Sequence, residues 1–372
     1  MSEWKKVKLG DILDFYNGKA IKVTNGPIPV YGSNGIIGYT EKPLYHNAII
    51  IGRVGAYCGS VAICQNAFWA SDNTIIVKAK NGESNIFYYF LLKIMNLNLY
   101  AGGAAQPLIT QTTLKSLETA IPPINTQHHI ATILSRYDSL IENYQKQIKL
   151  LEEAAQRLYK EWFVDLHFPG HENTKIVDGV PEGWEKKPVK TIIELQSGYA
   201  FKSSAFMEDG IYKIVTIKNV KDGAFDGENV SKIASIPEKM PKHCILEDGD
   251  ILLSLTGNVG RVCIVNGKNY LLNQRVAKLK STYKAYTYCL FRSRDMFIEV
   301  NNLANGAAQQ NVSPIRIGEM KILIPEKKWL DDFERTVSNY ILGIITLQSQ
   351  IRLLTEARDR LLPKLMSGEI AV

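Results

Sequence analysis

The sequence predicts an α+β fold: two tandem mixed α/β units, each followed by a long helix, with the two helices packed as an antiparallel coiled coil of pseudo-two-fold symmetry. Three observations lead to this fold class. The chain carries a long internal repeat, each copy ends in an apolar pattern with coiled-coil spacing, and the part before that pattern consists of short apolar runs between turn residues. The predicted domains are a first globular unit at 1–122, a central long helix at 123–165, a linker at 166–183, a second globular unit at 184–325, and a C-terminal long helix with its tail at 326–372.

The repeat covers most of the chain. Its matched pairs are Trp4 and Trp184, Gly18 and Gly198, and the Gly-Ala-Ala-Gln turns at 103–106 and 306–309. The first two pairs lie 180 residues apart (184 − 4) and the turns lie 203 apart (306 − 103), an offset that then holds along the helix after each turn. So long a register indicates a tandem duplication. The extra length of the second copy lies mainly between Phe201 and Asp250, so the copies share a framework and differ in one region.

The first part of each copy has the pattern of a mixed α/β unit. Residues 27–35 are rich in proline and glycine and predict a turn-rich loop. The apolar runs at 48–51 and 250–253 predict buried strands, each leading into a glycine turn. Residues 87–95 have the length and pattern of a short helix.

The second part of each copy predicts a long helix with a coiled-coil seam, because apolar residues recur in alternating steps of four and three. The predicted helix–helix packing residues are Ile130, Leu134, Tyr137, Ile141, Tyr144, Ile148, Leu151 and Leu158 in the first copy, and Phe333, Val337, Tyr340, Ile344, Leu347, Ile351, Leu354 and Leu361 in the second. Arg358 is the one polar residue in this pattern. Asn125 and Thr126 are predicted to cap the first helix. The alternative is that each helix packs only on its own unit.

The composition of the chain limits the classes of protein to which it can belong. The net charge of +7 is compatible with a polyanionic partner, although many basic proteins bind no nucleic acid. The five cysteines form no CxxC pair and are expected to be reduced, mostly buried thiols. The N-terminus lacks the apolar core of a secretion signal and no apolar run is long enough for a membrane span, so we expect a cytoplasmic protein without membrane contact.

No catalytic, metal or cofactor site is predicted on this chain. There is no GxxxxGK[ST] loop for ATP, and the single Pro-Pro pair, Pro122-Pro123, lacks the amide and the aromatic residue of a base-flipping methyltransferase motif. The histidine pairs His128/His129 and His167/His171 do not have metal-ligand spacing on a continuous helix.

The candidates for nucleic-acid contact, through phosphate oxygens or base edges, are polar residues in or beside glycine-rich turns, at corresponding predicted strand starts of the two copies, and in or near the divergent region. They are Lys19, Tyr31, Ser33, Asn34, Tyr39, Arg53, Asn73 and Gln106 in the first copy, and Lys202, Lys218, Arg261, Asn273, Gln274, Arg275, Gln309 and Gln310 in the second. The first five are assigned to one glycine-rich loop, and Arg53 and Arg261 to equivalent glycine turns. For each candidate the alternative is a structural role: an ordinary surface loop, a salt bridge, a strand-start hydrogen bond or a framework turn.

This arrangement resembles the specificity subunits of type I restriction–modification systems over nearly the whole chain. The motifs that carry the resemblance are Gly183-Trp184-Glu185, the Gly-Ala-Ala-Gln turns at 103–106 and 306–309, Ile121-Pro122-Pro123 before a helix, and the closing segment 361–370. Members of the family usually have Glu-Gln soon after the double proline. This chain has Thr126-Gln127 there and no equivalent in 326–330.

The resemblance implies a DNA-binding subunit with no catalysis of its own. Each globular unit would be a target-recognition domain for one half of a bipartite, asymmetric site in double-stranded DNA. The helices would set the gap between the two half-sites and would bind DNA methyltransferase subunits, two in the usual assembly. Motor-nuclease subunits would join this assembly. S-adenosylmethionine, ATP and Mg would be bound by those partners. The alternatives are a coiled-coil adaptor that does not touch DNA, an enzyme with an unrecognised site, and the specificity subunit of a related combined methyltransferase–nuclease system.

Overall fold

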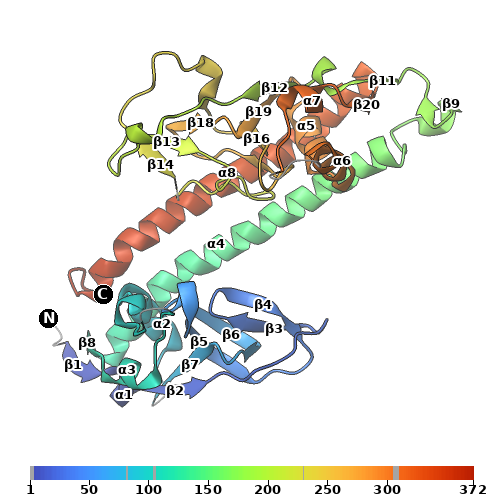
Figure 1. Cartoon of the computed structure of the whole chain (residues 1–372). Coiled ribbons are helices and arrows are strands. Elements are labelled where there is room, and N and C mark those ends of the chain that lie inside the picture. Colours follow the sequence, from blue (N-terminus) through green and yellow to red (C-terminus); the bar gives the residue numbers. More distant parts are fainter. Residues whose placement is uncertain (1–3, 81–82, 104–105, 229, 305–309) are drawn as a thin grey trace. The chain divides into compact units, whose positions relative to one another are not determined.

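The computed structural model describes residues 4–80, 83–103, 106–228, 230–304 and 310–372 (Figure 1). The chain divides into two compact units. The first unit consists of residues 1–141 and 354–372, and the second of residues 142–353. Two long helices, α4 (Ile124–Tyr159) and α8 (Lys327–Met366), each contribute one segment to both units.

The first unit is built on a six-stranded sheet of order β2-β7-β5-β6-β3-β4. The strands are β2 (Leu13–Asn17), β3 (Ile28–Gly32), β4 (Gly35–Thr40), β5 (Tyr45–Gly52), β6 (Val61–Ala70) and β7 (Thr74–Ala79). All neighbours are antiparallel except β3 and β6. Short elements complete the unit: β1 (Lys5–Lys8), α1 (Leu9–Ile12), α2 (Asn85–Ile94), η1 (Gly55–Tyr57), η2 (Leu97–Tyr100), α3 (Gln111–Ser116) and β8 (Glu118–Ile121). One apolar core joins β5, α2 and the helix segments of this unit.

The second unit has two four-stranded sheets. One contains β12 (Glu194–Ser197), β19 (Val276–Lys280), β16 (Ile251–Ser254) and β17 (Val262–Ile264), and the other contains β14 (Ser231–Ile233), β13 (Tyr212–Val215), β18 (Tyr270–Leu272) and β15 (Ile245–Leu246). The smaller elements are β9 (Ile176–Val177), β10 (Val180–Pro181), β11 (Glu185–Pro188), α5 (Lys284–Arg292), α6 (Arg294–Ala304), α7 (Pro314–Gly318) and β20 (Lys321–Ile324). The second of the two sheets takes in part of the extra length of this copy, between Phe201 and Asp250.

The strand pairing confirms the duplication. Lys5 pairs with Ile121 in the first unit and Glu185 pairs with Ile324 in the second, at the same offsets of 180 (185 − 5) and 203 (324 − 121) that the sequence shows. The parallel pairing of β3 with β6 has its counterpart in the parallel pairing of β13 with β18. The two units therefore share one framework.

The two long helices pair in each unit. In the second unit Leu151 Cδ1 lies 3.1 Å from where a Cβ on Gly343 would be, and the rings of Tyr159 and Phe333 are 6.3 Å apart. Higher numbers in α4 thus meet lower numbers in α8, as in an antiparallel pair. None of the sixteen seam positions given above is exposed, and Ile130, Leu134, Phe333, Val337 and Ile344 are fully buried. The alternative in which each helix packs only on its own unit is wrong.

Two local predictions are also wrong. The segment 27–35 is not a loop, because strand β3 occupies most of it and Val30 is fully buried between β4 and β6. Asn125 and Thr126 lie inside α4 rather than capping it. The carbonyl of Pro123 accepts the N–H of Gln127 at 3.0 Å, so the helix starts directly after the double proline, where a missing N–H costs nothing.

The other predicted elements are present. The helix expected at 87–95 is α2, whose first turn is capped by the Ser84 hydroxyl. The apolar runs at 48–51 and 250–253 lie in β5 and β16, with β16 beginning at Ile251. All five cysteines are buried and free. None of the helices in the described ranges has the length and apolar character needed to cross a lipid bilayer.

Candidate nucleic-acid interface

Backbone hydrogen bonds gather most of the first unit's candidates at one end of its sheet. The carbonyl of Asn73 accepts the N–H of Arg53 at 2.9 Å and the hydroxyl of Ser33 at 2.8 Å. The N–H of Gly55 donates to the carbonyl of Pro107, which follows Gln106. We call this region the first edge; it contains Lys19, Ser33, Asn34, Arg53, Asn73 and Gln106.

The second unit has a corresponding region. The carbonyl of Arg275 accepts the N–H of Leu255 at 3.0 Å, and the carbonyl of Gln310 accepts the N–H of Gly257 at 2.9 Å. Asn273 donates its N–H to Val215, three residues before Lys218. We call this region the second edge; it contains Lys218, Asn273, Gln274, Arg275 and Gln310.

The two edges have the same pattern of backbone hydrogen bonds. The bond from Arg53 to Asn73 corresponds to the bond from Leu255 to Arg275, at an offset of 202 (255 − 53 and 275 − 73). Arg53 and Leu255 also each accept one further N–H, from Ile109 and Val312. Asn73 and Arg275 are therefore structurally equivalent.

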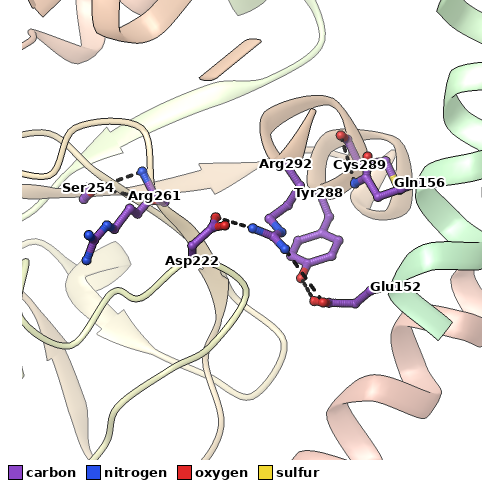
Figure 2. Close-up of polar contacts among 8 residues, drawn as sticks. All are labelled: Glu152, Gln156, Asp222, Ser254, Arg261, Tyr288, Cys289 and Arg292. Atoms are coloured by element: carbon purple, nitrogen blue, oxygen red, sulfur yellow. Dashed lines mark hydrogen bonds and ion pairs between the residues drawn. The ribbon is translucent and has the colours of Figure 1, made fainter. Parts of the chain in front are cut away.

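Arg53 and Arg261 do not occupy equivalent positions, although they flank equivalent turns. Arg53 precedes its glycine turn, whereas Arg261 follows the corresponding turn and donates its N–H to the Ser254 hydroxyl at 3.0 Å (Figure 2). The true counterpart of Arg53 is Leu255. The turn holds one residue fewer in the second unit, where its positive-φ glycines are 257 and 260 rather than 55 and 59.

A glycine present in both copies allows a close backbone contact at each edge. A Cβ on Gly18 would lie 1.9 Å from the carbonyl oxygen of Ser71, and one on Gly198 would lie 2.2 Å from that of Asn273. Both distances are far below van der Waals contact, so only glycine lets the chain after β2 or β12 approach the turn before β7 or β19. The glycine match seen in the sequence is thus a requirement of this framework.

Some candidates already use their side chains inside the protein. The Ser33 hydroxyl is donated to Asn73, and the Asn273 side-chain oxygen accepts the N–H of Arg275 at 3.3 Å. The Tyr31 ring packs edge-on against Phe68 with centroids 5.6 Å apart. Burial, then the neighbouring Cys64 thiol, raises the pKa of Tyr31 to about 12. A structural role fits these three residues.

The remaining candidates are open to solvent. The exposed ones are Lys19, Asn34, Tyr39, Asn73, Gln106, Lys202, Lys218, Gln274, Arg275 and Gln310, and the partly exposed ones are Arg53 and Arg261. Tyr39 lies on β4, the outermost strand of its sheet, and Lys202 precedes the short helix η6 (Ser203–Ala205). Neither residue belongs to the first or the second edge. Gln309 lies outside the described residues. In the part of the chain that the structure describes, no ion pair involves Arg53, Arg261 or Arg275.

The second unit also contains a polar network that the sequence did not reveal. Arg292, at the end of α5, contacts Glu152 of α4 at 3.7 Å and hydrogen-bonds Asp222 in the divergent region (Figure 2). The Tyr288 hydroxyl donates to the same Glu152 carboxylate. Burial, and then Glu152, raises the pKa of Tyr288 well above its ordinary value, so this phenol stays a neutral donor.

A second carboxylate holds the other end of α5. Glu334 of α8 accepts the N–H of Ala285 at 2.9 Å and that of Tyr286 at 3.3 Å. An anion at the N-terminus and a cation at the C-terminus both complement the helix dipole. These contacts fix α5 to both long helices within the second unit. No sequence pattern indicated these contacts, because Glu152 and Arg292 are 140 residues apart (292 − 152).

The pockets lined by described residues are open to solvent. The one beside the first edge has a volume of about 360 Å³ and is lined by 56–61, Lys93 and 96–98. Within the described ranges, no three His, Cys, Asp or Glu side chains are grouped as a metal site would need.

Comparison with known proteins gives a consistent family. A family profile described as the type I restriction modification DNA specificity domain matches residues 1–153 and 181–338. The MjaIX specificity subunit of a type I restriction enzyme from Methanocaldococcus jannaschii is 29% identical over 92% of this chain and 84% of its own length. The MjaVIII specificity subunit of the same organism is 27% identical over 100% of this chain and 93% of its own. The crystal structure of a type I S subunit from M. genitalium has the same fold, with a TM-score of 0.64, 19% identity, and coverage of 98% of this chain and 96% of that one.

Proposed function

The chain belongs to the family of type I restriction–modification DNA specificity subunits, and we propose that its two units bind the two halves of one bipartite, asymmetric DNA site. One observation carries the proposal. The same hydrogen-bonded edge occurs in both units, but the exposed side chains on it differ. A shared framework suits a shared DNA geometry, and different side chains suit different half-sites.

The chemistry of the edges fits double-stranded DNA. Lys19, Arg53 and Lys218 offer cations for phosphate oxygens, while Asn73 and Arg275 offer groups that pair with base edges. The helices α4 and α8 would act as the spacer that sets the gap, since each is continuous from one unit into the other.

Catalysis would belong to partner subunits. In this proposal the chain acts in the cytoplasm and carries no catalytic group and no cofactor. Two methyltransferase subunits would supply S-adenosylmethionine chemistry, and motor-nuclease subunits would supply ATP- and Mg-dependent cleavage. The long helices offer apolar side chains for such docking: Leu150 is 64% exposed on α4 and Leu342 is 61% exposed on α8. A related combined methyltransferase–nuclease system would use the same surfaces, and the genes beside this one would distinguish the two.

The decisive experiment is single-molecule methylome sequencing of a host that expresses the neighbouring methyltransferase with and without this chain. We expect a split, asymmetric methylation motif only when the chain is present. A soluble complex with the methyltransferase but no chain-dependent methylation would contradict the proposal and favour an adaptor that does not bind DNA.

Salt dependence gives an independent test of DNA contact. If the complex neutralises about 6 to 10 phosphates, its affinity for a duplex should fall by ~10³ to 10⁵ between 50 and 200 mM salt. An affinity that does not change with salt would contradict the proposed interface.

A further inference from the structure

We propose that Asn73 and Arg275 are equivalent base-contacting residues, and that they select adenine in the half-site of the first unit and guanine in the half-site of the second. This inference rests on the proposed function and deepens it. It follows from the backbone geometry of the two edges, from the exposure of the two side chains, and from the hydrogen bonds that these side chains can form.

The backbone holds both residues in the same place. Each is the third residue of a turn that precedes a strand. The turn is closed by the N–H of Thr74 to Ser71 at 3.0 Å in the first unit, and by the N–H of Val276 to Asn273 at 2.9 Å in the second. Thr74 and Val276, which follow the two turns, are both fully buried, so each turn is attached directly to the core of its unit.

The same turns are also held from the sides. The carbonyls of Asn73 and Arg275 accept the equivalent N–H groups described above, and Gly18 and Gly198 press against the turns with no space for a side chain. So constrained a backbone fixes the point from which each side chain projects, which keeps the side chain within reach of the same place on the DNA.

Both side chains are free to make new contacts. Each is exposed, and in the described ranges neither takes part in a side-chain hydrogen bond or ion pair within the chain. Their neighbours differ in this respect, because Ser33 and Asn273 already use their polar atoms internally. Two other arginines also differ, because Arg292 and Arg358 are largely buried in ion pairs.

The two side chains recognise different bases. An asparagine amide can bond both N6 and N7 of adenine, and an arginine guanidinium can bond both O6 and N7 of guanine, each in the major groove. One position on a common framework therefore carries two different base preferences. An exchange of side chains should carry the preference with it.

The experiment exchanges the residues in the full chain, co-expressed with its methyltransferase, and determines the methylated motif of the host genome. Arg275→Asn should change the preferred base at one position of one half-site from guanine to adenine, and Asn73→Arg should make the reverse change in the other half-site. The discrimination at that position should change by about 5- to 150-fold, with the opposite half-site and the gap unaltered. Arg294→Asn is the matched control, because Arg294 is exposed at the start of α6 and is not one of the second-edge residues, and it should leave the motif unchanged.

Arg275→Lys separates base recognition from phosphate binding. Lysine keeps the charge but lacks the planar fork, so selection of guanine should weaken while the salt dependence of duplex binding stays the same. An unchanged motif in Arg275→Asn, or a uniform loss across all sites, would overturn the inference. If the unsubstituted chain directs a split motif, such a result rejects only the inference; if it directs none, the proposed function itself fails.

Discussion

Each unit has a partly buried ion pair that involves a long helix, but the two pairs lie at different interfaces. In the first unit the pair joins the two long helices, where Arg358 of α8 bonds Asp138 of α4, with side chains 13% and 33% exposed. In the second unit the pair joins a globular element to a helix, where Arg292 of α5 meets Glu152 of α4. The duplicated framework has thus diverged in where its polar contacts lie.

Equivalent positions show the divergence directly. At the offset of 203, Arg358 corresponds to Ala155 (358 − 155) and Asp138 corresponds to Ile341 (341 − 138). Ala155 is fully buried and Ile341 is 7% exposed, so the helix seam of the second unit is apolar at this level. At this level of the seam the described residues thus make a polar contact in the first unit and an apolar one in the second.

The difference indicates what the ion pairs do. A buried ion pair is a weak source of stability, because desolvation offsets its attraction, but breaking it leaves an uncompensated charge. Such a pair penalises wrong registers more than it stabilises the right one. We infer that the Arg358–Asp138 pair fixes the register of the helices in the first unit, and that the Arg292–Glu152 pair fixes the position of α5 against α4 in the second.

The largest expected effect comes from moving the arginine to the apolar seam. Ala155→Arg would place an unpaired charge at a fully buried position and should destabilise the second unit by about 3–5 kcal/mol. Ala154→Arg, at the exposed neighbouring position, should change stability by no more than about 0.5 kcal/mol. Amide hydrogen exchange measures the opening free energy of each unit separately.

A second substitution sharpens this test. Ile341→Asp adds a carboxylate at the place that Asp138 occupies in the other unit. If the two positions are truly equivalent, Ala155→Arg combined with Ile341→Asp should cost less than the sum of the single substitutions, by about 1–3 kcal/mol. Strict additivity would show that the seams are not interchangeable.

The reverse exchange should have a smaller effect. Asp138→Ala should cost the first unit about 1–3 kcal/mol, because Arg358 loses one partner but keeps Asp359 at 2.8 Å. Replacing the pair together, Asp138→Ile with Arg358→Ala, should be neutral or stabilising, since apolar replacements of a buried pair usually are. Urea unfolding of all three chains checks both, and a double variant less stable than Asp138→Ala would contradict the register interpretation.

Removal of the α5 cap should cost less again. Glu334→Ala removes the acceptor for the first N–H groups of α5, and about 1–2 kcal/mol should be lost locally. The counterpart of Glu334 in the first unit is Ala131, at the same offset (334 − 131), and α2 is capped by its own Ser84 instead. Exchange should therefore accelerate in α5 and not in α2. Arg335→Ala, which removes an exposed charge from α8, should have little effect on either.

The features that the sequence predicted correctly depend on local or repeated patterns. The helix seam follows from residue spacing alone, so Ile130 and Phe333 could be placed without a structure. The glycines at 18 and 198 were visible because both copies keep them, although the contact that requires them was not. The second sheet of the second unit was missed because its strands are only two to four residues long and most of them lie in the divergent region between Phe201 and Asp250.

The features that were missed depend on contacts between distant residues. Asp138 and Arg358 are 220 residues apart, and nothing in the pattern around Asp138 marks it as a partner. The true counterpart of Arg53, Leu255, was missed because the glycine turn that follows it differs in length by one residue, which made Arg261 look like its counterpart. Hydrogen bonds identify the equivalent residues where the alignment of the two copies cannot.

The smallest effect at neutral pH is expected for Tyr31→Phe. Tyr31 has Val215 as its counterpart, because Ser71 and Asn273 donate equivalent N–H groups to these two residues. Burial raises the pKa of Tyr31 from 10.0 to about 12, so the phenol is neutral in both folded and unfolded chains below pH 10, and its contribution to stability is then complete. As the pH rises from 10 to 12, the unfolded chain releases this proton first and the contribution is lost.

Tyr31→Phe should change stability by less than about 1 kcal/mol at pH 7 and should lose less stability than the parent between pH 10 and 12. Parallel urea titrations at pH 7, 10 and 11 measure the difference, and identical pH dependence in the two chains would mean that Tyr31 titrates as it does in the unfolded chain.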